Sequence, residues 1–130
     1  MKRLLLDTHI ALWAITDSPR LPGEARAAIV NANHQIAVSA ISIWEIAIKH
    51  GLRREAMPID GTAALRHFRA AGFEILGVGA DEAAAVDALP AVHADPFDRL
   101  LVAQARTSGW KLLTADTILG GYGDAVVVVR

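Results

Sequence analysis

Leu4-Leu5-Leu6-Asp7-Thr8-His9 joins a short apolar run to a carboxylate at its end. Three large apolar residues without alternation predict a strand buried on both faces of a parallel sheet. Residues 10–15 are predicted to form a short helix. Asp7 would then stand at the carboxyl end of a strand, where open α/β sheets place their ligands. Asp7 could equally cap the helix, and this stretch leaves both interpretations open.

Apolar strands and helices alternate along the rest of the chain. Further strands are predicted over 35–40, 73–78, 111–114 and 126–129, and further helices over 24–32, 42–50, 62–71, 81–89 and 95–107. The alternation predicts an α/β fold with a central parallel five-stranded sheet, strand order 3-2-1-4-5, and helices on both faces. With 130 residues and no internal repeat or linker, the chain is expected to form a single domain over 1–130.

The composition excludes some classes of site and leaves others open. Hydrophobic residues make up 53% of the chain, so part of this apolar surface is expected at an interface. Thirteen basic residues face fourteen acidic ones, so net charge argues neither for nucleic acid nor against a local basic patch. The absence of cysteine excludes disulfides and thiolate metal sites. No apolar run approaches the roughly 20 residues of a membrane span, and no signal peptide follows Lys2 and Arg3, so a cytoplasmic location is expected.

Four carboxylates are predicted to meet at one edge of the sheet. Asp7 and Asp116 end strands, Glu45 lies in the first turn of the helix after the second strand, and Asp98 opens the helix before the fourth. Each acid also has a capping explanation. Ser42-Ile43-Trp44-Glu45 has the pattern of a capping box, Asp95 is assigned first to capping, Asp98 suits the helix dipole, and Asp116 could cap the next turn. The set as a whole is harder to explain by capping, because independent caps have no reason to collect at one edge.

Carboxylates that share a cleft repel one another, by about 1 kcal/mol per pair at ~4 Å in bulk water and by more near a protein surface. Without a cation, one or more would have a raised pKa. Hard oxygen ligands favour Mg²⁺ or Mn²⁺ over zinc, although the flanking His9 and His93 leave zinc open. The predicted chemistry is hydrolysis of a phosphodiester by a metal-activated water. Three neighbouring hydroxyls are expected to hold a water or substrate phosphate, or else to cap helices and turns: Thr8, Ser42 and Thr114.

Four blocks of the sequence resemble the PIN-domain ribonucleases, and in particular the toxin of VapBC-type toxin–antitoxin pairs. The blocks are Leu-Leu-Leu-Asp7-Thr8-His9, Ser42-Ile-Trp-Glu45-Ile-Ala-Ile-Lys49, His93-Ala-Asp95-Pro-Phe-Asp98-Arg99-Leu-Leu-Val-Ala-Gln104 and Leu-Leu-Thr114-Ala-Asp116. The resemblance runs through nearly the whole chain. It implies a PIN-like three-layer sandwich and a Mg²⁺- or Mn²⁺-dependent endoribonuclease.

The resemblance also implies roles for individual residues. Asp7, Glu45, Asp98 and Asp116 match the family's acidic quartet, which would be both catalytic and metal-binding, and Asp95 matches a less central acid. The substrate would be RNA, often tRNA or rRNA. A VapB-type antitoxin would lay a helix or an extended tail across the acidic cleft, and the toxin would form a homodimer.

Basic and apolar residues near the acids are candidates for binding RNA or the antitoxin. Arg99 lies nearest the proposed cleft, and Lys49, Arg53 and Arg54 follow Glu45, so these side chains could meet phosphates; a solvated face explains Arg53 and Arg54 equally well. Apolar residues of the first helices would line an antitoxin groove or belong to the core: Leu12, Trp13, Ile29, Ile43, Ile46 and Trp44.

Two other functions stay open. A haloacid-dehalogenase-like phosphatase also starts from a strand that ends in Asp, but that class needs a second Asp two residues later, where this chain has His9. The other alternative is a non-catalytic PIN-like module that binds RNA or a partner. The complete acidic quartet argues against idle acids.

Overall fold

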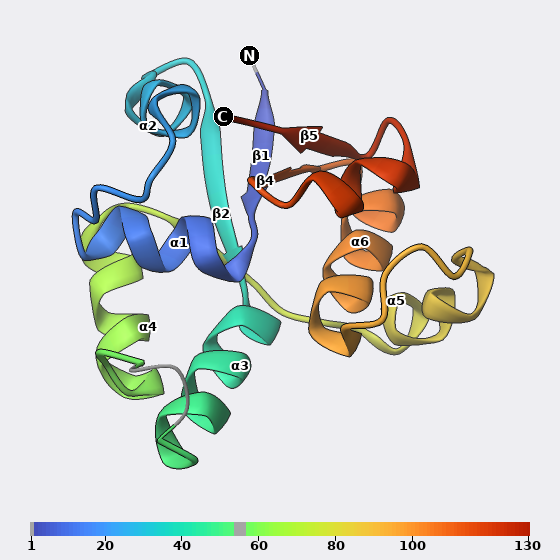
Figure 1. Cartoon of the computed structure of the whole chain (residues 1–130), viewed down its shortest axis with the longest axis horizontal. Coiled ribbons are helices and arrows are strands. Elements are labelled where there is room, and N and C mark those ends of the chain that lie inside the picture. Colours follow the sequence, from blue (N-terminus) through green and yellow to red (C-terminus); the bar gives the residue numbers. More distant parts are fainter. Residues whose placement is uncertain (1, 54–56) are drawn as a thin grey trace.

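The computed structural model of the chain describes residues 2–53 and 57–130. Its centre is a sheet of five parallel strands in the order β3-β2-β1-β4-β5 (Figure 1). The strands are β1 (Arg3–Leu6), β2 (Gln35–Ser39), β3 (Glu74–Leu76), β4 (Lys111–Thr114) and β5 (Val126–Val128). The predicted fold class and strand order are confirmed.

Helices cover both faces of this sheet. In Figure 1, α1, α2 and α4 lie to one side of the strands, and α5 and α6 lie to the other. The helices are α1 (Thr8–Ile15), α2 (Gly23–Val30), α3 (Ala40–Gly51), α4 (Gly61–Ala70), α5 (Ala80–Ala84) and α6 (Pro96–Ser108), with 3₁₀ helices η1 (Ala85–Ala88) and η2 (Thr117–Tyr122). In the described part of the chain, no helix is both long and apolar enough to cross a bilayer.

The helix predicted over 81–89 is shorter than expected. It forms α5 and then continues as the tighter η1, and Leu89 already has extended backbone. Leu89 precedes Pro90, whose ring disfavours helical backbone at the residue before it. The proline therefore limits how far this helix can run.

The strand β1 is buried on both faces, as its sequence predicts. Leu5 packs into an apolar cluster with α6, and Leu6 packs into a second cluster with α1 and α4. Both leucines are fully buried. The same alternation holds in β4, where Leu112 and Leu113 point to opposite clusters. A run of consecutive apolar residues is needed here because helices exclude water from both faces.

Leu5→Ala is expected to lower the free energy of unfolding by about 2–5 kcal/mol, because it opens a cavity beside the central strand. Urea denaturation measures the change. Leu52→Ala is the matched control, since Leu52 is 59% exposed and its truncation should change stability by no more than about 0.5 kcal/mol. Equal losses in the two variants would contradict this account of the core.

Candidate functional site

Asp7 stands at the carboxyl end of the central strand and also begins a helix. Its Oδ1 accepts a hydrogen bond of 2.8 Å from the Ile10 N–H, which makes Asp7 the N-cap of α1. Its Oδ2 accepts a hydrogen bond from the hydroxyl of Thr114, at the end of the neighbouring strand β4. The capping interpretation of Asp7 is confirmed. The interpretation of Asp7 as a ligand-binding residue stays a prediction, and its second oxygen lies beside the end of β4.

The capping box predicted over Ser42–Glu45 is wrong. The helix α3 begins at Ala40, and its cap is Ser39, whose side chain accepts from the Ile41 N–H. Because β2 runs directly into the helix at Ser39, Ser42 falls in the first turn and Glu45 falls beyond it. Both side chains are buried instead of exposed at the helix start. Glu45 is thus free of the capping role and faces α1.

Two side chains, Thr8 and Lys49, hold the Glu45 carboxylate, and Ser42 supports Thr8. The Thr8 hydroxyl lies 2.6 Å from Oε1 of Glu45 and 2.9 Å from the Ser42 hydroxyl, and Lys49 Nζ lies 2.7 Å from Oε2. A hydroxyl has one proton and an ionised carboxylate has none, so Thr8 donates to Glu45 while Ser42 donates to Thr8. These buried hydroxyls orient an acid, a role that helix capping does not explain.

Asp95 and Asp98 have different roles at the start of α6. Oδ1 of Asp95 accepts from the Phe97 and Asp98 N–H groups, which confirms Asp95 as the N-cap. Asp98 lies one turn in and faces the other acids. Burial, followed by the charges of Asp95, Asp7 and Glu45, raises the pKa of Asp98 to about 7, while His93 acts in the opposite direction. The carboxylates of Asp7, Glu45 and Asp98 therefore lie near enough for their charges to act on one another.

Asp116 joins this site from the end of β4. Its Oδ1 caps η2 by accepting from the Ile118 N–H, and its Oδ2 lies 3.0 Å from Nε2 of His93. The same His93 nitrogen lies 3.7 Å from Oδ2 of Asp98. One possible ligand atom from each of these three residues lies within 4.8 Å of the others. His9, the second flanking histidine, is exposed and packs its ring against Trp13.

A hollow of about 270 Å³ opens beside Asp7 and Asp116. Its lining residues are Asp7, His9, Trp13, Arg20, Ala115 and Asp116. Arg20 is exposed and belongs to the connection between α1 and α2. Sequence reasoning missed Arg20, because it lies in a proline-rich break with no motif around it. A larger hollow of about 350 Å³ lies next to α2 and β3, and none of the four acids lines it.

Two basic residues predicted to contact RNA, Arg99 and Lys49, form hydrogen bonds with other groups of the protein. Arg99 Nη1 donates to the Pro90 carbonyl and the Tyr122 hydroxyl, both at 3.1 Å, and Nη2 reaches the Val86 carbonyl. Arg99 thereby holds the loop before α6. Its contact with RNA stays a prediction, as does that of Lys49, which the Glu45 carboxylate holds at the site.

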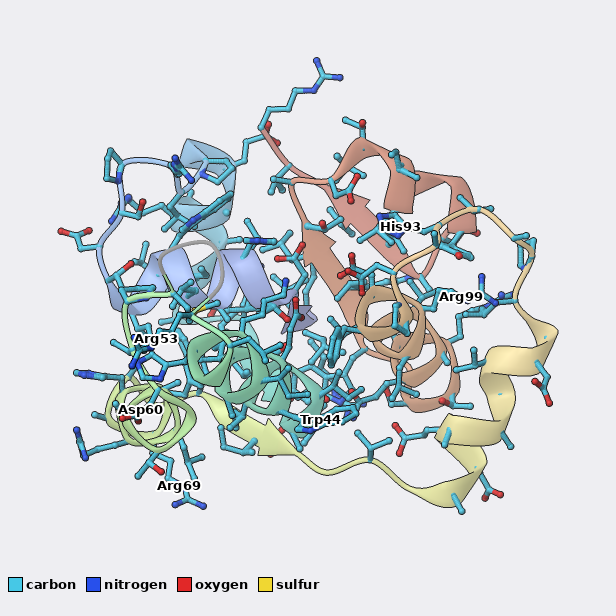
Figure 2. All side chains as sticks on the ribbon, turned by 60° about the horizontal axis from the view of Figure 1, so that its bottom comes forward. Trp44, Arg53, Asp60, Arg69, His93 and Arg99 are labelled. Atoms are coloured by element: carbon cyan, nitrogen blue, oxygen red, sulfur yellow. The ribbon has the colours of Figure 1, made fainter. Side chains whose placement is uncertain are left out.

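Arg54 lies outside the described residues, and Arg53 follows the end of α3. The six residues predicted to line an antitoxin groove or to belong to the core differ in how deeply they are buried. Leu12 and Ile46 are core residues, and Trp13, Ile29 and Ile43 are half-buried. Trp44 is 57% exposed and meets Phe97 edge-to-face, with ring centroids 5.3 Å apart. Figure 2 shows Trp44 on α3, next to α6.

The site suits a hard divalent cation. Burial raises the pKa of the Asp7 carboxyl above its usual range, although hydrogen bonds from Thr114 and Ile10 act in the opposite direction. Burial is also the largest cause of the raised pKa of Asp98. Such carboxylates are costly to ionise together without a cation. Their oxygens match the ligands that Mg²⁺ and Mn²⁺ prefer, so the residues present fit such an ion.

The raised pKa of Asp98 predicts a pH dependence of stability. An unfolded Asp titrates near pH ~3.9, whereas folded Asp98 has a pKa of about 7. Between these values the folded protein binds more protons, so its free energy of unfolding falls as the pH rises. Urea denaturation of the metal-free protein between pH 4.5 and 8 should show this fall, and Asp98→Asn should make it shallower. An identical slope in the variant would contradict the assignment.

Comparisons with known proteins agree with this fold. The sequence pattern of the PIN domain family matches residues 4–123. The chain is 36% identical over 123 residues to Ribonuclease VapC22 of Mycobacterium tuberculosis. The matched region covers 94% of this chain and 93% of that protein. Two solved structures share the fold. VapBC2 from Rickettsia felis, bound to a DNA fragment from its promoter, has a TM-score of 0.70 at 17% identity and covers 97% of this chain and 96% of its own. A toxin–antitoxin complex from Klebsiella pneumoniae has a TM-score of 0.67 at 24% identity and covers 96% of each chain.

Proposed function

Because the chain belongs to the PIN domain family, we propose that it is a Mg²⁺- or Mn²⁺-dependent endoribonuclease and the toxin of a toxin–antitoxin pair. One observation carries the proposal: the acids Asp7, Glu45, Asp98 and Asp116 come from separate elements to one end of the sheet, where Asp7 and Glu45 are buried and Asp98 and Asp116 each offer an oxygen within 4.8 Å of the other and of His93. Placing acids next to one another in a partly buried site destabilises the folded protein through repulsion and desolvation, so a functional role is the better explanation. Similarity to a protein named as a ribonuclease supports the substrate class.

In this proposal, Asp7, Glu45, Asp98 and Asp116 hold the divalent cation. When bound, the cation would lower the pKa of a water and neutralise charge on the phosphodiester. The remaining residues position the acids. Thr114 holds one oxygen of Asp7, and Thr8 and Lys49 hold the two oxygens of Glu45. This network fixes the carboxylates before the cation or RNA arrives, so little reorganisation is needed at the reacting phosphate.

We place the RNA path over the hollow beside Asp7 and Asp116. Arg20 and His9 are exposed on its lining, so Arg20 can meet a phosphate next to the acids. The near-balanced net charge of the chain makes such a local contact more important for RNA binding.

Arg20→Ala is expected to raise KM for RNA roughly three- to tenfold with little change in kcat, as for one phosphate contact worth about 1 kcal/mol. Steady-state cleavage at several salt concentrations checks this, and the variant should also show a weaker salt dependence. Arg69→Ala is the matched control, because Arg69 projects from the outer side of α4, far from His93 in Figure 2. Equal effects in the two variants would move the RNA path elsewhere.

A VapB-type antitoxin and a second copy of the chain are the proposed protein partners. The two structural neighbours are described as VapBC2 and as a toxin–antitoxin complex. The exposed side chain of Trp44 beside α6 offers apolar surface close to the acids, which suits a partner that covers the cleft. Such a partner would silence the nuclease by blocking access to the acids.

Expression of the chain without a partner tests the function directly. We expect growth arrest and new RNA ends at discrete positions in tRNA or rRNA, mapped by sequencing, and neither effect with Asp7→Asn. Phosphate release from a small phosphoester without RNA cleavage would favour the haloacid-dehalogenase-like phosphatase. RNA binding without new ends would favour a non-catalytic module.

A further inference from the structure

We propose that His93 is a positioning residue that donates a hydrogen bond to Asp116 and is not itself a ligand of the cation. The inference rests on the proposed function, because it assigns a role beside the proposed metal site. The cluster of His93, Asp98 and Asp116 by itself would allow the opposite assignment, in which His93 Nε2 binds the ion. The hydrogen bonds of the imidazole decide between the two.

The Nδ1 atom of His93 must carry a lone pair. It lies 3.1 Å from the backbone nitrogen of Asp95, and that N–H points at it. A backbone N–H can only donate, so Nδ1 accepts. A neutral imidazole has one N–H, which must then be on Nε2. That atom lies 3.0 Å from Oδ2 of Asp116, so its N–H faces a carboxylate and its lone pair is not available to a metal.

The backbone of His93 is also held in place. The His93 backbone N–H donates to the Tyr122 hydroxyl at 3.0 Å, and Arg99 donates to the same hydroxyl. Arg99 further reaches the carbonyls of Pro90 and His93. Tyr122 is buried. These contacts fix the backbone of the loop that carries His93, and thus the direction in which Nε2–H points.

The donor role matters most for Asp116. The Asp116 side chain is 36% exposed. One of its oxygens is held by η2, and the other depends on His93 for its orientation. A donor that orients a ligating carboxylate commonly contributes 10- to 100-fold to metal affinity. Without nitrogen in the ligand set, the site offers carboxylate oxygens, which favour Mg²⁺ and Mn²⁺ over Zn²⁺.

Two spectroscopic measurements test the assignment of His93. In the metal-free ¹⁵N-labelled protein, long-range ¹H–¹⁵N NMR should show the His93 imidazole with its proton on Nε2; the signal is assigned by its loss in His93→Ala. In the Mn²⁺-bound protein, pulsed EPR should show no ¹⁴N coupling from a coordinated imidazole. A proton on Nδ1, or a coordinated-nitrogen signal that His93→Ala removes, would overturn the inference.

Variants separate the donor from the rest of the ring. His93→Gln keeps an N–H that can reach Asp116, whereas the shorter side chain of His93→Asn keeps an acceptor for the Asp95 N–H but places its own N–H out of reach of Asp116. We expect the Kd for Mn²⁺, measured by calorimetry, to rise about tenfold in His93→Asn and His93→Ala and less than about threefold in His93→Gln. His67→Ala is the control, because His67 is exposed on α4.

The outcomes distinguish the two proposals. An equal loss in His93→Gln and His93→Ala, or no loss in either, would overturn the role of His93 while the wild type still binds Mn²⁺. Failure of the wild type to bind Mn²⁺ would overturn the proposed function and the positioning role with it. The NMR result on the metal-free protein would still report the tautomer in that case.

Discussion

Asp7→Asn is expected to lower the rate of RNA cleavage by at least about a hundredfold while the fold stays intact. The substitution removes a proposed cation ligand, whose loss should exceed the 10- to 100-fold effect of an outer hydrogen-bond partner. Asparagine keeps the oxygen that caps α1 through the Ile10 N–H, and Asn is as good a cap as Asp. It also removes a carboxyl whose pKa is raised by burial, so the metal-free protein should unfold at no lower urea concentration. Single-turnover cleavage of a labelled RNA and urea denaturation measure the two effects.

Asp60→Asn is the matched control for Asp7→Asn. Asp60 is the N-cap of α4, where its Oδ1 accepts from the Ala63 N–H, and it is exposed. Figure 2 places it on α4, away from His93 and Arg99. The control makes the same chemical change at a helix start, and its cleavage rate should stay within about twofold of wild type. If Asp7→Asn behaves in the same way, Asp7 returns to a purely structural capping role.

Removal of divalent cations is expected to abolish cleavage, and Mg²⁺ or Mn²⁺ is expected to restore it. The physical reason is the cluster of acids, two of them buried, whose repulsion a cation relieves. Binding to the folded state also stabilises it, by about 2.7 kcal/mol at a cation concentration 100 times the Kd. Thermal unfolding with and without Mn²⁺ should therefore show a rise in Tm for the wild type and a smaller one for Asp7→Asn. Full activity in EDTA would exclude the metal mechanism.

The fold was predictable because its signals are local. The unbroken Leu4–Leu6 run and the alternation of strands with helices point to a buried parallel sheet, and the observed strand order agrees. Asp95 was predictable as a cap because an aspartate before Pro96 and the start of a helix has few other roles. The start of α3 was not predictable, because Ser39 and Ser42 both suit a cap, and the length of β2 decides between them.

The positions of the acids along the chain were predictable, but their contacts with other residues were not. The acids could be placed at one edge from their positions at strand ends and helix starts, and the PIN-domain resemblance added to that expectation. The hydrogen bonds of Arg99 to Tyr122 and to the loop before α6 could not be read from the sequence, and its contact with RNA stays a prediction. Arg20 carries no motif and lines the hollow beside Asp7.

The chain's own residue order was sufficient for the α/β class and the central strand, since these follow from hydrophobic periodicity and backbone preferences within a few neighbouring residues. Tertiary contacts alone settle which atom each acid meets: Thr114 is 107 residues from Asp7, and Glu45 is 37 residues from Thr8. Burial and the charges of Asp95, Asp7 and Glu45 raise the pKa of Asp98. Asp7 and Glu45 belong to remote segments that only folding brings near Asp98, and the burial itself exists only in the folded chain, so local residue order could not determine this pKa.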